Sequence, residues 1–170
     1  FRLLGAILAD AGGRAGIGIN DLGCGYGALF DAFRDIPCLA GGRYLGYDIN
    51  PRMLMAARAR IDDPRARFIE SFAATETADF SFVSGTYNIK MRADEETWLA
   101  YVEASLLDLW EKTRLGLAFN MMSRRGTARE NTLYYADPLH FLAFCQDRLS
   151  PRVQLRHDYH LPEFTVFVYR

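Results

Sequence analysis

The glycine-rich stretch 21–28, which reads DLGCGYGA, carries the residue types and spacing that most clearly suggest chemistry. Gly23, Gly25 and Ala28 satisfy the pattern G-x-G-x-x-G/A, in which glycines let the backbone approach a ligand closely. Asp48 lies 20 residues beyond Ala28, near the spacing of a carboxylate that binds ribose hydroxyls. On this pattern alone, a nicotinamide dinucleotide is one ligand that the loop could bind.

Asp21, which stands just before the first glycine of the loop, favours a different ligand. A dinucleotide would bring its pyrophosphate to this place, where a carboxylate repels the anion. S-adenosylmethionine would instead bring an ammonium and a sulfonium, and both of these groups are cationic. The charge of Asp21 therefore favours S-adenosylmethionine.

Two motifs make the sequence resemble the class I S-adenosylmethionine-dependent methyltransferases over nearly the whole chain. The stretch 21–27 is similar to the first motif of that family, and the stretch 48–54, which reads DINPRML, is similar to the second. The resemblance implies one methyltransferase domain over residues 1–170. It also implies S-adenosylmethionine as cofactor and S-adenosylhomocysteine as product.

The same resemblance implies a role at the cofactor for each matching residue. The backbone at Gly23 and Gly25 would line the methionine part, and Asp21 would serve its ammonium end. Asp48 would accept hydrogen bonds from the two ribose hydroxyls, in a charge-assisted arrangement.

The resemblance implies apolar and polar contacts to the adenine. Ile49 and Met53 would pack on the ring. Many members of the family place an Asp just after the third strand to accept from the adenine amino group, but this chain has none there. Glu70, the hydroxyl of Ser71 or the backbone near Phe72 would take over that contact.

Short strands and helices that alternate along the chain must position these residues. The apolar runs and the turn residues predict seven strands, at 17–22, 43–48, 67–70, 79–84, 115–121, 153–159 and 164–169. Helices are predicted at the N-terminus, after the glycine loop, at 51–61, from Asp94 through Leu109 and at 138–149. The last two strands are joined by too few residues for a helical crossover, so they must be antiparallel.

These elements predict an α/β fold, and the resemblance adds its topology. It implies a Rossmann-like sheet of seven mostly parallel strands in the order 3-2-1-4-5-7-6. The last strand would be antiparallel, and helices would cover both faces.

The methyl acceptor should lie beyond the carboxyl ends of the fourth and fifth strands, where open α/β sheets bind their ligands. Tyr87 and Asn88 follow the fourth strand and are the predicted catalytic residues, because they could orient an acceptor. Packing in the core for Tyr87 and a turn for Asn88 are the alternative interpretations. Ser84, at the end of the same strand, is a predicted cofactor contact. The stretch 84–90 lacks the Asn/Asp-Pro-Pro-aromatic signature of enzymes that methylate amide or exocyclic amino nitrogens, so those substrates are less expected.

Arginines follow the fifth strand, in an irregular segment that could cover the acceptor. Arg124 and Arg125 are the predicted substrate-binding residues, with Arg129 nearby, because guanidinium groups bind acidic groups. The alternative is a solvated surface. Methyl transfer from a sulfonium is an in-line displacement, so alignment and exclusion of water can supply much of the rate and a dedicated base is optional.

The histidines lie elsewhere. His140 falls in a predicted helix start, and His157 and His160 fall in the terminal hairpin, where polar surface roles are expected. No metal site is predicted.

The composition disfavours several classes of protein. The 170 residues carry 20 Lys and Arg against 21 Asp and Glu, which is too balanced for a phosphate-binding face, so no nucleic acid partner is expected. No apolar run approaches the roughly 20 residues of a membrane span, so no membrane partner is expected. The three cysteines have no disulfide-framework or metal-ligand spacing, which favours a reducing compartment and predicts a cytoplasmic protein.

The sequence therefore predicts a methyltransferase that acts on an oxygen or nitrogen of a small molecule, such as a sugar or an acidic metabolite. One alternative is a nicotinamide-dependent reductase, which leaves Asp21 unexplained. The other is a non-catalytic subunit that binds S-adenosylmethionine or a partner, which the missing adenine Asp favours.

Overall fold

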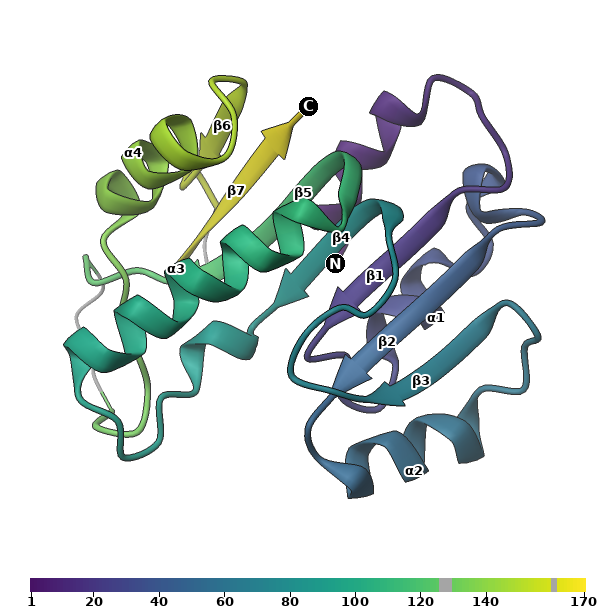
Figure 1. Cartoon of the computed structure of the whole chain (residues 1–170), viewed down its shortest axis with the longest axis horizontal. Coiled ribbons are helices and arrows are strands. Elements are labelled where there is room, and N and C mark those ends of the chain that lie inside the picture. The colour runs from purple at the N-terminus through teal and green to yellow at the C-terminus, as the bar shows by residue number, and fades with distance from the viewer. Residues whose placement is uncertain (126–129, 160–161) are drawn as a thin grey trace.

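The structure of the protein is a computed structural model that describes residues 1–125, 130–159 and 162–170 (Figure 1). Its strands are β1 (Gly18–Leu22), β2 (Arg43–Asp48), β3 (Ala66–Glu70), β4 (Ala78–Ser84), β5 (Thr113–Met122), β6 (Val153–Arg156) and β7 (Glu163–Tyr169). Its α-helices are α1 (Ala28–Phe33), α2 (Pro51–Arg60), α3 (Glu95–Glu111) and α4 (Pro138–Arg148). Three 3₁₀ helices complete the elements: η1 (Leu4–Ala11), η2 (Pro37–Leu39) and η3 (Thr86–Asn88).

All seven strands form one sheet in the order β3-β2-β1-β4-β5-β7-β6. Strands β1 to β5 pair in parallel, and β7 runs antiparallel to both β5 and β6. The predicted fold class, strand order and antiparallel last strand are confirmed. The predicted strand 153–159 is wrong in its length: β6 ends at Arg156, the last residue that pairs with β7, and Asp158 lies back against the Arg156 guanidinium at 2.8 Å instead of extending the strand.

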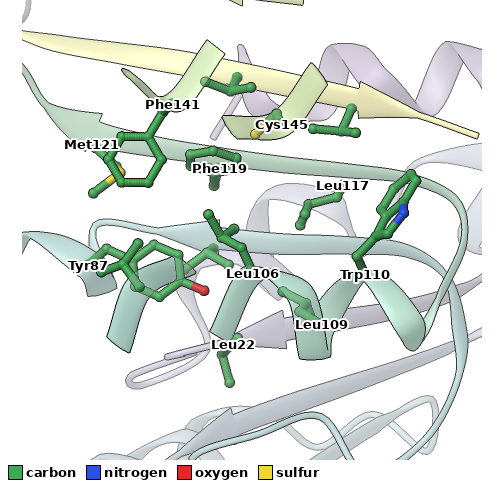
Figure 2. Close-up of a cluster of buried hydrophobic side chains, with 14 of the residues drawn as sticks. Leu22, Tyr87, Leu106, Leu109, Trp110, Leu117, Phe119, Met121, Phe141 and Cys145 are labelled. Carbon is green, nitrogen blue, oxygen red and sulfur yellow. The ribbon is translucent and has the colours of Figure 1, made fainter. Parts of the chain in front are cut away.

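Helices cover both faces of the sheet (Figure 1). Residues of η1, α1 and α2 share one buried apolar cluster with one face of the strands, and residues of α3 and α4 share a second cluster with the other face. Figure 2 shows the second cluster, where Leu106 and Leu109 of α3 face Leu117 and Phe119 of β5. Among the described residues, no helix combines the length and the apolar character that crossing a membrane requires.

Side-chain caps begin three of the α-helices: Asn50 begins α2, Asp94 begins α3 as the sequence predicts, and Asp137 begins α4. Asn50 accepts from the N–H of Arg52, and Asp94 accepts from the N–H of Thr97. Pro51 takes the first position of α2, where its missing N–H is not needed. These caps fix where α2 leaves the carboxyl end of β2.

The connection from β3 to β4, residues 71–77, contains no helix. It returns across the face of the sheet that also carries α3 (Figure 1). Two contacts hold it there: the N–H of Glu76 donates to the Tyr47 hydroxyl at 3.3 Å, and the Asn20 side chain donates to the Glu76 carbonyl at 2.9 Å. The connection is short for a parallel crossover, which usually carries a dozen or more residues.

Candidate functional site

The glycine loop follows the carboxyl end of β1, and its glycines have different structural tasks. Gly23, Gly25 and Gly27 all have positive φ angles, of 76°, 54° and 85°. A Cβ atom on Gly23 would lie 1.9 Å from Oγ1 of Thr86, so this glycine is needed for packing. A Cβ atom on Gly25 would meet no atom within 4 Å. Gly25 therefore presents bare backbone to open space that a ligand could fill.

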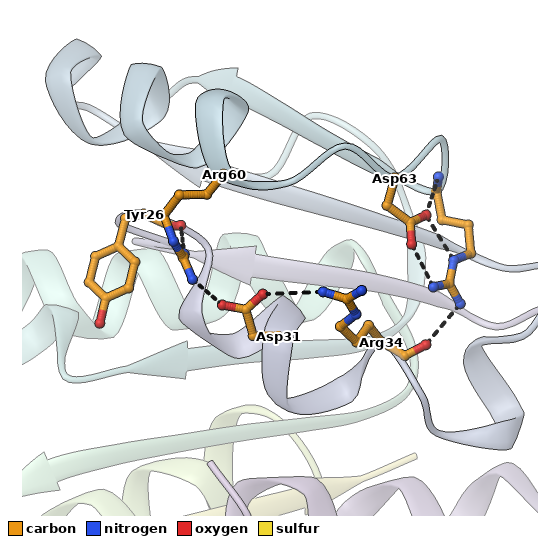
Figure 3. A network of polar contacts seen from close by, with 6 residues as sticks. Tyr26, Asp31, Arg34, Arg60 and Asp63 are labelled. Carbon is orange, nitrogen blue, oxygen red and sulfur yellow. Dashed lines mark hydrogen bonds and ion pairs between the residues drawn. The ribbon is translucent and has the colours of Figure 1, made fainter.

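Hydrogen bonds hold the loop from two sides. On its inner side, the N–H groups of Gly23 and Cys24 donate to one main-chain carbonyl of β2, at 2.7 and 2.9 Å. On its outer side, the guanidinium of Arg60 donates to the Tyr26 carbonyl at 2.8 Å and pairs with Asp31 of α1 (Figure 3). The loop is thus fastened to both β2 and α2 before any ligand binds.

Asp48, at the carboxyl end of β2, faces the same loop. Its Oδ2 accepts from the N–H of Gly25 at 2.9 Å, and its Oδ1 accepts from the N–H of Asn50 at 2.8 Å. Each carboxylate oxygen can accept more than one hydrogen bond, and the residue is only partly buried. The carboxylate is therefore fixed in place and can still accept from two hydroxyls.

Asp21 lies beneath the loop and is only 2% exposed. It lines a cavity of about 190 Å³ together with Gly23, Gly25 and Ser84. Its Oδ2 accepts a hydrogen bond from the Tyr44 hydroxyl. Burial raises the pKa of Asp21 from 3.8 to about 7, although the Tyr44 hydrogen bond opposes this rise. The carboxyl is therefore harder to ionise than an exposed one.

Exposed apolar side chains lie beside Asp48. Ile49 and Met53 are 71% and 41% exposed, and Phe72 is 72% exposed after the neighbouring strand β3. The ends of β2 and β3 are adjacent, because Asp48 pairs with Glu70. Large exposed apolar side chains gathered at one sheet edge are typical of a ligand site.

The Ser71 hydroxyl, a predicted adenine contact, takes part in hydrogen bonds of its own segment. The Ser71 hydroxyl donates to the Ala73 carbonyl at 2.7 Å and accepts from the Ala73 N–H at 3.1 Å. Its donor is used in a local turn, so only its second acceptor lone pair could take part in an adenine contact. Glu70 is exposed and remains a predicted contact.

The predicted catalytic role of Tyr87 does not fit its position. The side chain is fully buried in the apolar cluster of Figure 2, and its hydroxyl is 2.9 Å from Oγ of Ser105 on α3. Burial raises the pKa of the Tyr87 hydroxyl well above its usual range. The hydroxyl cannot reach an acceptor without movement of the core, so the alternative of core packing describes this residue better.

Asn88 is also buried and serves to connect segments. Its Oδ1 accepts from the N–H of Met122 at 2.8 Å, and its carbonyl accepts from the N–H of Tyr134 at 2.8 Å. A second amide, Asn120 of β5, accepts from the N–H of Gly85 at 2.8 Å and donates to Glu163 at 2.9 Å. These bonds fix the backbone around η3 and leave Asn88 a positioning role.

Arg124 and Arg125 line a second cavity, of about 570 Å³, which shares no residue with the cavity beside the glycine loop. Its other lining residues come from α3, α4 and the segment before α4: Glu95, Leu99, Tyr134, Tyr135, Asp137 and His140. Arg124 pairs with Asp137. The structure thus brings the two predicted substrate-binding arginines into one polar cavity. Arg129 lies outside the described residues.

The histidines take surface positions. His140 lies 2.7 Å from the Glu103 carboxylate, and His157 is exposed beside the ring of Phe164. His160 lies outside the described residues. In the part of the chain that the structure describes, no three His, Cys, Asp or Glu side chains gather as metal ligands would.

Two residues of this site were missed by the sequence analysis. Tyr44 contacts Asp21 because of the register between β1 and β2, in which Asp21 pairs with Gly46. Tyr44 lies two residues before Gly46, so its side chain is on the same face of the sheet as that of Asp21. Thr86 closes over Gly23 and donates to the Leu22 carbonyl at 3.1 Å. Strand alternation could have suggested Tyr44, but only with the register already known.

Comparisons with known proteins agree with this geometry. Residues 20–104 match the family described as a methyltransferase domain. The chain is 39% identical over 153 residues to a protein of Mycobacterium tuberculosis named "Putative methyltransferase Rv1506c", and the match covers 88% of this chain and 91% of that protein.

Solved structures share the fold at low sequence identity. Magnesium protoporphyrin IX methyltransferase from Synechocystis PCC 6803, solved with bound S-adenosylmethionine, superposes with a TM-score of 0.67 at 14% identity, over 99% of this chain and 76% of that one. Human N-acetylserotonin methyltransferase superposes with a TM-score of 0.68 at 16% identity, over 90% of this chain and 47% of that one. Together with the glycine loop and the Asp48 carboxylate, the family match and the mycobacterial relative show that the chain belongs to the class I S-adenosylmethionine-dependent methyltransferases.

Proposed function

We propose that the protein transfers the methyl group of S-adenosylmethionine to an oxygen or nitrogen of a small molecule. One observation carries the proposal: the open backbone of Gly25 donates to the Asp48 carboxylate at 2.9 Å. This bond joins the loop that would take the methionine part to the acid that would take the ribose. Three free cysteines favour a reducing compartment and hence the cytoplasm.

The residues of the loop and of β2 would hold the cofactor. Gly23 and Gly25 give the methionine part access to the backbone, and Asp48 accepts from the ribose hydroxyls. Ile49, Met53 and Phe72 would pack on the adenine through their exposed apolar surfaces. When bound, the cofactor supplies an electrophilic methyl group on a sulfonium.

The acceptor would be aligned chiefly by backbone around η3. Thr86 touches Gly23, so this segment lies against the methionine end of the proposed cofactor site. The bonds from Asn88 and Asn120 hold it rigidly, which supports catalysis by alignment. The cavity with Arg124 and Arg125 mixes both signs of charge and supports a small polar acceptor with an acidic group.

Calorimetry with the full chain tests cofactor binding. S-adenosylmethionine and S-adenosylhomocysteine should each bind at one saturable site, and NADH and NADPH should not bind. Gly25→Ala should keep the fold and lower the affinity for S-adenosylmethionine at least tenfold, because the new methyl group projects into the ligand space.

Gly12→Ala is the matched control for this variant. Gly12 also has a positive φ, of 59°, with no atom within 4 Å of a Cβ, but it ends η1 away from the loop. Both variants should lose about 1–2 kcal/mol of stability from the left-handed backbone, and only Gly25→Ala should lose affinity. Tighter binding of a nicotinamide cofactor would overturn the proposal.

A panel of sugars, hydroxy acids and amines then tests transfer from radiolabelled S-adenosylmethionine. Methylation of at least one oxygen or nitrogen acceptor is expected. Saturable cofactor binding without transfer to any member of the panel would favour the non-catalytic subunit instead.

A further inference from the structure

The contact between Asp21 and Tyr44 is the buried polar feature that methyl transfer alone does not explain. Asp21 comes from β1 and Tyr44 from β2, and the Tyr44 hydroxyl donates to Oδ2 of Asp21. Asp21 also lines the cavity beside Gly23 and Gly25, so the residue lies between Tyr44 and the proposed methionine site.

Packing leaves the Tyr44 side chain little freedom. It is fully buried, and its ring lies 5.1 Å from that of Phe30 and 6.0 Å from that of Phe68. Gly46, opposite Asp21 in the ladder, has no side chain that could compete for the space between them. The hydroxyl is therefore held against Oδ2, and Oδ1 is the oxygen through which Asp21 would meet a ligand.

We propose that Tyr44 is a positioning residue for cofactor binding: its hydroxyl aims the Asp21 carboxylate at the cationic methionine end of the cofactor and favours the charged form of that carboxylate. The inference rests on the proposed function, since it assumes that this cavity takes S-adenosylmethionine or its product.

The groups around Asp21 oppose its ionisation, which explains why the hydrogen bond from Tyr44 is needed. Burial and the charge of Asp48 both raise the pKa of Asp21, and the Tyr44 hydrogen bond lowers it. The Cys24 thiol of the loop is itself kept protonated, because burial and the charges of Asp21 and Asp48 raise its pKa. Asp31 of α1 acts on Tyr44 with a further negative charge, and Arg58 of α2 acts on Cys24 as a cation.

A pH-dependent affinity follows from this arrangement. A ligand with an ammonium group binds the charged form of Asp21, so its affinity should rise with pH up to about 7, the pKa of the carboxyl. Without the Tyr44 hydroxyl the charged form loses one hydrogen bond, and the midpoint of the pH profile should move upward by about one to two pH units.

The test measures dissociation constants from pH 5.5 to 7.5 for S-adenosylhomocysteine and for 5′-methylthioadenosine. Only the first ligand carries the ammonium, which stays protonated in this range because an α-amino group titrates near 8. For the wild type, the affinity for S-adenosylhomocysteine should rise up to about tenfold per pH unit below the midpoint. The affinity for methylthioadenosine should not change with pH.

For Tyr44→Phe, the affinity for S-adenosylhomocysteine should still rise about tenfold per pH unit up to pH 7.5, where that of the wild type levels off, because the midpoint of the variant lies above this range. Its affinity for methylthioadenosine should not change with pH. Tyr47→Phe is the matched control, since Tyr47 is an equally buried tyrosine of β2 whose hydroxyl contacts Asn20 on the other face of the sheet. It should lose stability and keep the wild-type midpoint.

The outcomes separate the inference from the proposed function. A Tyr44→Phe profile that superposes on the wild type overturns the role of Tyr44, whereas failure of both ligands to bind the wild type overturns the proposed function. If Tyr44→Phe does not fold, Asp21→Asn replaces it: this variant should bind methylthioadenosine normally and show no pH dependence with S-adenosylhomocysteine. A retained pH dependence in Asp21→Asn would overturn the inference.

Discussion

Two neighbouring regions of the carboxyl edge of the sheet, at β1 and β2 and at β4 and β5, treat their polar groups in opposite ways. At β1 and β2, the Asp48 carboxylate and the Gly25 backbone bind each other and still face open space. At β4 and β5, the Tyr87 hydroxyl and the Asn88 side-chain oxygen are buried and already hydrogen-bonded, to the Ser105 hydroxyl and to the N–H of Met122. The first region is ready to bind a ligand without rearrangement, whereas the second supplies a rigid frame. Selectivity for the acceptor should therefore depend on shape and on the surrounding loops more than on these two side chains.

The largest expected effect is on stability, and it comes from the ionisation of Asp21 in the first region. The pKa of Asp21 is raised from 3.8 to about 7 in the folded protein, so its ionisation opposes folding. The stability that this group allows is fully present below pH 3.8 and is lost as the pH rises to about 7. The stability advantage of Asp21→Asn, which cannot ionise, over the wild type should therefore grow by roughly 2–3 kcal/mol from pH 5 to pH 8. Urea denaturation at the two pH values measures this gain, and an equal difference at both would contradict it.

Asp48→Ala should give the next largest effect, now on binding. The substitution removes a charged acceptor, which contributes roughly 1.5–3 kcal/mol, so the affinity for S-adenosylhomocysteine should fall about tenfold to a hundredfold. Asp79→Ala is the control, because Asp79 also accepts a backbone hydrogen bond, from Gly18 at 2.7 Å, but at the amino edge of the sheet. Calorimetry should find wild-type affinity for the control. Wild-type affinity in a folded Asp48→Ala protein would show that the second motif does not bind ribose.

Asn88→Ala tests the frame of the second region. It leaves the buried N–H of Met122 without its acceptor, which should lower the free energy of unfolding by about 1–3 kcal/mol. The affinity for S-adenosylhomocysteine should change less than threefold. The exposed neighbour Asn131 provides the control, since Asn131→Ala should stay within about 0.5 kcal/mol of the wild type. A loss of cofactor affinity with unchanged stability would mean that the two regions are not separate.

Tyr87→Phe should have the smallest effect. It removes one buried hydrogen bond, to Ser105, and should lower stability by about 0.5–1.5 kcal/mol. Ser105→Ala should cost a similar amount, and the double variant should cost less than the sum of the two. Once an acceptor is known, the turnover of Tyr87→Phe should stay within threefold of the wild type. A tenfold loss of turnover at wild-type stability would instead restore the catalytic role that the sequence suggests for this tyrosine.

The residues of the proposed cofactor region lie together as the sequence predicts, because the signals for them are local. Glycines at fixed offsets, a strand before them and an acid after the next strand belong to a short stretch, and their geometry follows from their order. The order of the sheet followed from the resemblance, and the antiparallel hairpin followed from a connection too short for a crossover.

The acceptor region could not be predicted in the same way. Whether Tyr87 points to the core or to the site depends on how α3 packs against β4 and β5, and no spacing in the sequence encodes that packing. Tyr44 was missed for a related reason, because its contact with Asp21 depends on the register between two strands. Ser71 is occupied by a turn of its own backbone, which residue type alone does not reveal.

The helix-free connection between β3 and β4 also acts as a tether of nearly fixed length. From Glu70 to Ala78 the chain must cross three strand spacings and return about six residues along the sheet, a diagonal of roughly 25 Å. Eight extended steps reach at most about 26–29 Å. This diagonal is for a flat sheet, and the twist of the sheet shortens it enough to admit the turn at Ser71. The segment still has little slack: an inserted residue can bulge outward, but removing one would pull β3 from its place at the margin of the sheet and, with it, the end of the strand beside Asp48.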